Sequence, residues 1–125
     1  MIYLDTHVVI WLYAGLVEKF TPQARALINE SDLLISPIVG LELQYLHELH
    51  WITVDSSTII ADLEHRIGLR ICDAPFGDVV ARALALSWTR DPFDRLIVAQ
   101  AQTRQSPLLT KDATILARFP EALWP

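Results

Sequence analysis

Short hydrophobic runs alternate with longer amphipathic segments along this chain. We expect buried strands at residues 2–5, 33–35, 69–72 and 107–110, because each run is mostly apolar and too short for a helix. Between them stand helix-start signals, in which a Thr, Ser or Asp precedes a proline: Thr21-Pro22, Ser36-Pro37 and Asp91-Pro92. Strands that alternate with helices predict an α/β fold with a mostly parallel sheet.

The expected helices fill the segments between these strands. The first follows residue 5 and ends near Gly15. The pattern contains no repeat or linker, and 125 residues suit one domain, residues 1–125, with one core. Further helices are expected at residues 21–29, 36–50, 56–68, 76–88, 91–104 and 112–119, and an edge strand at residues 123–124.

Composition narrows the class of protein. Hydrophobic residues make up 52% of the chain, enough to leave apolar surface for a homodimer or a partner. The net charge of −5 excludes a basic, nonspecific nucleic-acid coat and suits a protein that gathers carboxylates around a cation. The uncharged stretch 6–17 is too short to span a bilayer, and Asp5 precedes it, so we expect neither a membrane anchor nor a signal peptide. The single cysteine, Cys72, fits a reducing cytoplasm.

Several acidic residues fall where parallel strands end or helices begin. Asp5 ends the first expected strand and Asp112 follows the fourth, so both would face the crevice at the carboxyl ends of the strands, where ligands bind in such sheets. Asp91 and Asp94 flank a helix start that can reach the same edge. Taken singly, Asp91 and Asp112 also suit helix caps, and Asp94 suits the first turn of a helix.

Glu42 has no such capping explanation. It shares a helix face with Ile38, Tyr45, Leu46 and Leu49, and we expect this otherwise apolar face to turn toward the protein. Two carboxylates about 4 Å apart repel by roughly 4 kcal/mol at an effective dielectric constant of 20, so converging acids favour a bound cation. Ligands that are all oxygen atoms favour Mg²⁺ or Mn²⁺, which assist reactions at phosphoryl groups.

Four sequence blocks together resemble the PIN domain, and more closely a VapC-type toxin of bacterial type II toxin–antitoxin pairs. The resemblance covers essentially the whole chain and implies a three-layer, Rossmann-like α/β/α fold with a mostly parallel sheet. The blocks occur in the family's order: IYLDTHVVIWL, SPIVGLEL, RDPFDRLIVAQA and LLTKDATIL.

The resemblance also implies an activity and its residues. Members of this family cleave RNA with Mg²⁺ or Mn²⁺ held by three or four acids. The family's acids match Asp5, Glu42, Asp94 and Asp112 here, with no departure from the pattern, while Thr6 and Thr110 match hydroxyl positions that assist them. Asp91 either caps its helix or takes part in the site. The implied partners are an RNA substrate, a cognate VapB-like antitoxin whose tail often carries arginine, and a second copy of the chain.

Two other classes remain open from the sequence. A receiver-like phosphoacceptor domain would suit the length, the fold class and Thr110-Lys111, but it would have adjacent acids after the first strand and no role for Glu42. A non-catalytic interaction domain would use the acids only as caps. Beside the expected site, His7 suits either a phosphate contact or an ordinary helix start. The basic residues near it suit RNA steering or solvated surface: Arg90, Arg95, Lys111 and Arg118.

Overall fold

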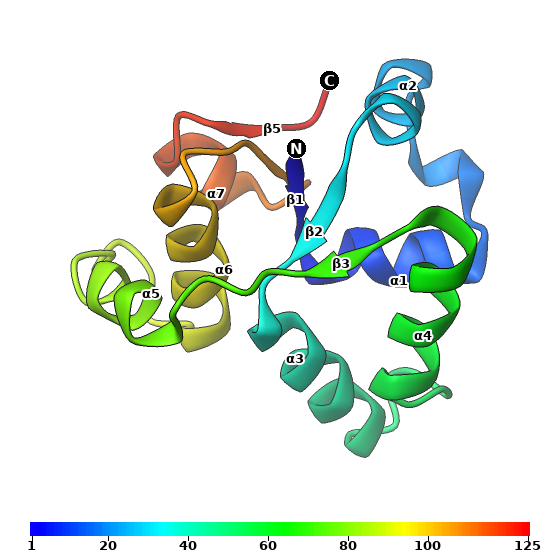
Figure 1. The fold of residues 1–125 in the computed structure, drawn as a ribbon, viewed down its shortest axis with the longest axis horizontal. Helices are drawn as coiled ribbons and strands as arrows, with labels where there is room; N and C mark the ends of the chain where they lie inside the picture. The colour runs from blue at the N-terminus through cyan, green and yellow to red at the C-terminus, as the bar shows by residue number, and fades with distance from the viewer.

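Five parallel strands form one sheet with helices on both sides (Figure 1). The computed structural model describes residues 1–125. The strand order is β3-β2-β1-β4-β5, so β1 lies at the centre. This arrangement confirms the predicted three-layer α/β fold. The strands are β1 (Ile2–Leu4), β2 (Leu33–Ile35), β3 (Arg70–Ile71), β4 (Leu108–Leu109) and β5 (Ala122–Leu123).

The helices divide into two groups around the sheet. In Figure 1, α5, α6 and α7 lie to the left of the strands, and α1 to α4 lie to the right and below. Right-handed crossovers that run outward in both directions from β1 place their helices on opposite faces. None of the helices is both long and apolar enough to cross a membrane. The helices are α1 (Thr6–Ala14), η1 (Val17–Lys19, a 3₁₀ turn), α2 (Pro22–Glu30), α3 (Pro37–Glu48), α4 (Ser56–Ile67), α5 (Phe76–Ala83), α6 (Pro92–Thr103) and α7 (Ala113–Arg118).

Most helices begin where the sequence predicts. Thr21, Ser36 and Asp91 each accept a hydrogen bond from a backbone N–H of the helix that follows, and a proline occupies the first turn of each helix. Such caps stabilise a helix by about 1 kcal/mol. Gly15 ends α1 in the left-handed conformation (φ 69°), which glycine adopts without strain. Local sequence chemistry therefore sets most of the helix boundaries.

The centre of the sheet forms the core. Ile2, Tyr3 and Leu4 of β1 are at most 1% exposed, because β2 and β4 flank the strand and helices cover both faces. Cys72 is buried, and its Sγ accepts hydrogen bonds from the Tyr3 hydroxyl at 3.0 Å and from Gln100 Nε2 at 3.2 Å. The buried central strand holds the residue after it, Asp5, in a fixed position.

Two sequence predictions are wrong in detail. Helix α5 ends at Ala83 rather than near residue 88, because the chain turns there and brings Leu86 into the core. The face of α3 that carries Glu42 is only partly turned inward: Ile38, Glu42 and Leu46 are half-buried. Helix α3 instead buries Val39 and Leu43, while Tyr45 is 48% exposed. Glu42 therefore lies at the edge of the buried surface rather than within it.

Candidate active site

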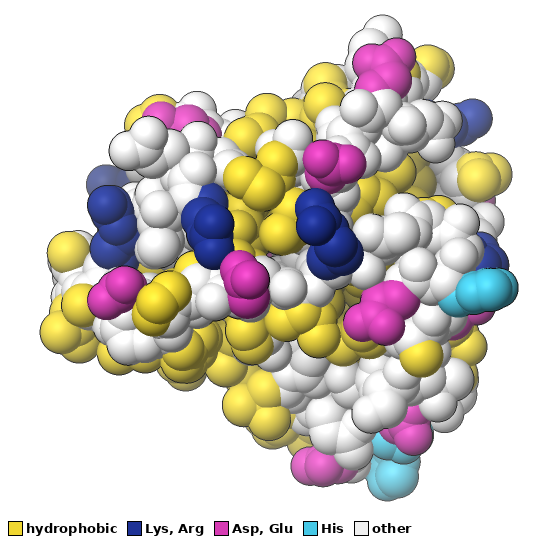
Figure 2. Space-filling model, in the orientation of Figure 1, with side chains coloured by type: hydrophobic (Ala, Val, Ile, Leu, Met, Phe, Trp, Pro, Cys, Tyr) yellow, Lys and Arg dark blue, Asp and Glu magenta, His cyan; other side chains and the backbone are white.

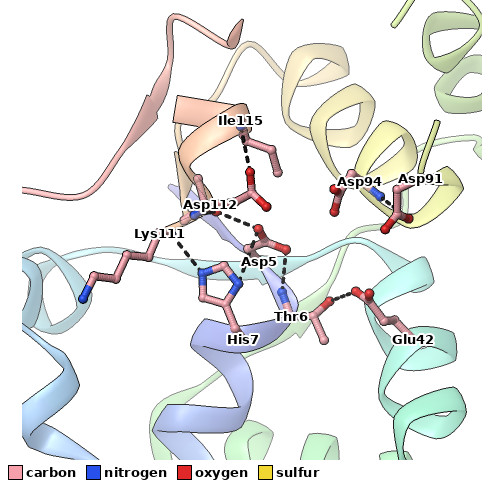
Figure 3. Close-up of polar contacts among 10 residues, drawn as sticks. Asp5, Thr6, His7, Glu42, Asp91, Asp94, Lys111, Asp112 and Ile115 are labelled. Carbon is pink, nitrogen blue, oxygen red and sulfur yellow. Dashed lines mark hydrogen bonds and ion pairs between the residues drawn. The ribbon is translucent and has the colours of Figure 1, made fainter. Parts of the chain in front are cut away.

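Five carboxylates from four parts of the fold line one pocket at the carboxyl end of the sheet (Figure 3). Strands β1 and β4 are neighbours at the point where the strand order reverses, which is the usual ligand crevice of open parallel sheets. Asp5 follows β1 and Asp112 follows β4, while the contacting helices α3 and α6 add the other acids. The pocket has a volume of about 240 Å³, and its lining residues are Asp5, Thr6, His7, Ile10, Glu42, Leu46, Asp91, Asp94 and Asp112.

Asp5 is only 4% exposed and accepts two short hydrogen bonds. Its Oδ1 accepts the backbone N–H of Thr6 at 2.8 Å, and its Oδ2 accepts the hydroxyl of Thr110 at 2.7 Å. Asp5 also caps α1, whose N-terminus favours a negative charge. Of the basic side chains, only His7 lies within ion-pair distance, with Nδ1 3.7 Å from Asp5 Oδ2. The buried carboxylate is therefore held by neutral donors and has no lysine or arginine partner.

Glu42 reaches the pocket from α3. The hydroxyl of Thr6, which is 3% exposed, donates a hydrogen bond to Glu42 Oε1. Burial raises the pKa of Glu42, and the charges of Asp5 and Asp91 raise it further, although the hydrogen bond from Thr6 acts in the opposite direction. Thr6 thus links the carboxylates after β1 and in α3 through its backbone N–H and its hydroxyl.

Asp94 experiences the crowding of charge most strongly. Burial in the first turn of α6 raises its pKa to about 7, and the carboxylates of Asp91, Asp5, Asp112 and Glu42 add to the effect. No lysine or arginine lies within ion-pair distance of any of these carboxylates. The pocket is therefore an anionic site whose repulsion no basic side chain offsets.

Asp91 and Asp112 each cap a helix and also line the pocket. Asp91 Oδ1 accepts the backbone N–H of Phe93 at 2.8 Å and that of Asp94 at 3.3 Å. Asp112 Oδ1 accepts the N–H of Ile115 at 2.9 Å, and its own N–H donates to the Thr110 hydroxyl at 3.0 Å. In these positions no three acidic, histidine or cysteine side chains form a ready-made metal site. The carboxylates share one pocket but keep apart from one another.

The sequence left the role of His7 open, and the structure gives it a fixed place. Its Nε2 accepts the backbone N–H of Lys111 at 2.9 Å, which ties the start of α1 to the loop after β4. Arg90 and Arg95 instead donate to backbone carbonyls at Ser87 and Thr89. Trp11 lies four positions after His7 on α1 and contacts it, with ring centroids 4.9 Å apart. That spacing of four was a signal that the two rings share a face.

The family model of the PIN domain matches residues 2–121. The chain belongs to the PIN domain family. No curated protein matches the chain closely enough to count as a relative. The fold of this PIN domain is similar to those of solved structures that cover nearly all of it.

Three of those structures have similar folds at low sequence identity. A toxin–antitoxin complex from Klebsiella pneumoniae is 19% identical, with 98% of this chain and 96% of that chain covered and a TM-score of 0.65. VapBC2 from Rickettsia felis, bound to a DNA fragment from its promoter, is 20% identical, with coverage of 98% and 96% and a TM-score of 0.66. VapBC-1 from nontypeable Haemophilus influenzae is 19% identical, with coverage of 100% and 97% and a TM-score of 0.58. At these identities the likeness establishes the fold.

Proposed function

We propose that this PIN domain is a divalent-metal-dependent endoribonuclease and the toxin of a VapBC-type toxin–antitoxin pair. The observation that carries the proposal is the pocket of five carboxylates without a basic partner, in which the pKa of Asp94 reaches about 7. Strongly raised pKa values of crowded carboxylates are concentrated at functional sites. Membership of the PIN family and the likeness to VapBC structures support the same activity.

The donor set fits Mg²⁺ or Mn²⁺. Carboxylate and hydroxyl oxygens line the pocket, and neither a cysteine nor a pair of histidines is present in it. Asp5, Glu42, Asp94 and Asp112 would hold the ion. When bound, a divalent cation would supply positive charge that stabilises the phosphodiester group under attack. Thr110 fixes the carboxylate of Asp5, and Thr6 fixes that of Glu42, so both acids would be oriented before the ion binds.

The acidic pocket and the exposed side of α5 suggest two protein partners. An antitoxin segment that carries arginine would bind the carboxylates, because a guanidinium pairs with them in bidentate geometry. A homodimer is supported by apolar side chains left on the surface of α5: Phe76, Val80 and Leu84 recur at spacings of four and are 39%, 40% and 75% exposed. Figure 2 shows hydrophobic side chains over α5 at the left, with acidic and basic side chains interspersed among them. The single, buried Cys72 suits action in the reducing cytoplasm.

RNA cleavage by the purified protein tests the proposal. We expect cleavage with Mg²⁺ or Mn²⁺ and none in EDTA, and we expect Asp94→Asn and Glu42→Gln to lower the rate by orders of magnitude. Two matched controls remove one charge outside the pocket. Asp78→Asn changes the first turn of α5, as Asp94→Asn does in α6, and Glu48→Gln changes the exposed end of α3. Cleavage that persists undiminished in EDTA would exclude the metal mechanism.

A further inference from the structure

Both lysines of the chain lie over tryptophan rings. Lys19 Nζ is 5.4 Å from the ring centroid of Trp11, and Lys111 Nζ is 5.9 Å from that of Trp124. The two indole rings pack edge to face, with centroids 6.0 Å apart and an interplanar angle of 77°. We call Trp11, Lys19, Lys111 and Trp124 the lysine–tryptophan surface. It joins side chains from α1, η1 and the loops that follow β4 and β5.

A second hollow connects this surface to the carboxylates. It has a volume of about 320 Å³ and is lined by His7, Trp11, Lys111 and Asp112, of which His7 and Asp112 also line the acidic pocket. The hydrogen bond from the Lys111 N–H to His7 Nε2 fixes the boundary between the two hollows (Figure 3). A ligand bound at the carboxylates can therefore continue directly onto the lysine–tryptophan surface.

No acidic side chain of the fold neutralises the two lysines of this surface. No carboxylate lies within ion-pair distance of either lysine, although the chain has a net charge of −5. The acidic pocket repels phosphate groups, so a polyanion that enters it needs cations nearby. Lys111 lines the hollow that adjoins the pocket, and Lys19 lies over Trp11, which lines the same hollow, so both lysines can supply this positive charge to the next phosphates of a bound strand.

We propose that the lysine–tryptophan surface and its hollow bind the unpaired nucleotides on one side of the cleaved phosphate. Lys19 and Lys111 contact backbone phosphates, and a base packs against the indole of Trp11 in the hollow. Aromatic rings combined with cations are typical of surfaces that bind single strands, and the bases of a duplex are already stacked on one another. The inference rests on the proposed nuclease function and adds to it a binding surface for the nucleotides beside the cleaved phosphate.

Binding of a short, single-stranded RNA in EDTA, across a series of salt concentrations, tests the inference. Lys19→Ala and Lys111→Ala should each weaken binding several-fold and lower the slope of log K against log salt by about 0.7, the value for one phosphate contact on a single strand. Lys111→Arg should retain both affinity and slope. Arg70→Ala is the matched control, since it removes one exposed positive charge on β3, at the opposite edge of the sheet.

An abasic strand of the same length separates the phosphate contacts from the base contact. It should bind more weakly than RNA with an unchanged salt slope, and a duplex should compete poorly. If Lys19→Ala and Lys111→Ala match Arg70→Ala in affinity and slope, the inference is wrong, including the case in which the lysines serve an acidic protein partner instead. Cleavage with Mg²⁺ is measured on the same proteins. Wild-type cleavage with unaffected lysine variants would overturn only this inference, whereas lysine-dependent binding without any cleavage would overturn only the proposed nuclease function.

Discussion

At the scale of single residues, the acidic pocket is held by hydroxyl groups rather than by basic side chains. Thr110 is fully buried and donates to Asp5 Oδ2, and Thr6 donates to Glu42. A hydrogen bond to a charged group stabilises a fold by about 1.5–3 kcal/mol, and a buried carboxylate that loses a donor costs a similar amount. The two threonines therefore make the carboxylates tolerable in the absence of a cation.

Replacing Thr110 tests this role. Thr110→Val preserves the shape of the side chain but removes the donor to Asp5 and the acceptor for the Asp112 N–H, so we expect it to lower the free energy of unfolding by about 1.5–3 kcal/mol. Thr110→Ser keeps the hydroxyl and should lose less, because only a methyl group is removed. Urea unfolding of both variants measures the difference. Equal losses in the two variants would mean that packing, not the hydrogen bond, is what Thr110 contributes.

The raised pKa of Asp94 predicts how stability depends on pH. Its pKa lies near 3.8 in the unfolded chain and at about 7 in the fold, so the folded state binds the proton more tightly. This contribution to stability is full below about pH 4 and is lost as the pH rises to about 7. Thermal melts in EDTA should therefore show a smaller pH-dependent loss for Asp94→Asn than for wild type. Asp78→Asn, in the first turn of α5, is the control and should lose as much stability as wild type. If Asp94→Asn lost as much stability with rising pH as Asp78→Asn does, the raised pKa of Asp94 would be contradicted.

Among the secondary-structure elements, α6 positions Asp94 through the N-terminal cap that Asp91 provides. Asp91 caps the helix through the N–H groups of Phe93 and Asp94, and this fixes the first turn from which Asp94 faces the pocket. We expect Asp91→Asn to be nearly neutral for stability, because Asn is an equally good cap, and Asp91→Ala to cost about 0.5–2 kcal/mol. Cleavage by Asp91→Asn should fall far less than by Asp94→Asn. Equal losses would place Asp91 among the groups that hold the cation.

The elements also show what sequence could and could not predict. Caps and prolines are local signals, so the starts of α2, α3 and α6 were predictable, as was the position of Asp5 after a buried strand. The face of α3 that packs against the core was not predictable, because periodicity identifies a stripe of apolar residues but does not show whether that stripe faces the core. Tyr45 lies outside the core and stacks on Phe93, with ring centroids 5.8 Å apart. The hollow beside Trp11 depends on Lys111, which is distant in sequence, so only the fold reveals it.

At the scale of the whole molecule, the sheet gathers charge that the rest of the fold does not balance. The reversal of strand order between β1 and β4 brings the loops after both strands together, and α3 and α6 close the same edge. Three ion pairs occur in the structure. Only the one between His7 and Asp5 involves the pocket, and it requires a protonated histidine. The stability of the molecule should therefore depend on whether a cation occupies the pocket.

Thermal melts with EDTA and with Mg²⁺ measure that dependence directly. An ion that binds only the folded state stabilises it by mass action, by about 2.7 kcal/mol when its concentration is one hundred times Kd. Wild type and Glu48→Gln should therefore show the same rise in Tm with Mg²⁺. Asp94→Asn and Glu42→Gln should melt higher than wild type in EDTA near pH 8, because one repelling charge is gone, and should gain much less from Mg²⁺. A cap that is lost lowers Tm in both buffers, so this opposite pattern separates a shared cation site from a purely structural role. If all four proteins gained equally from Mg²⁺, the ion would be binding elsewhere and the four-acid site would have to be abandoned.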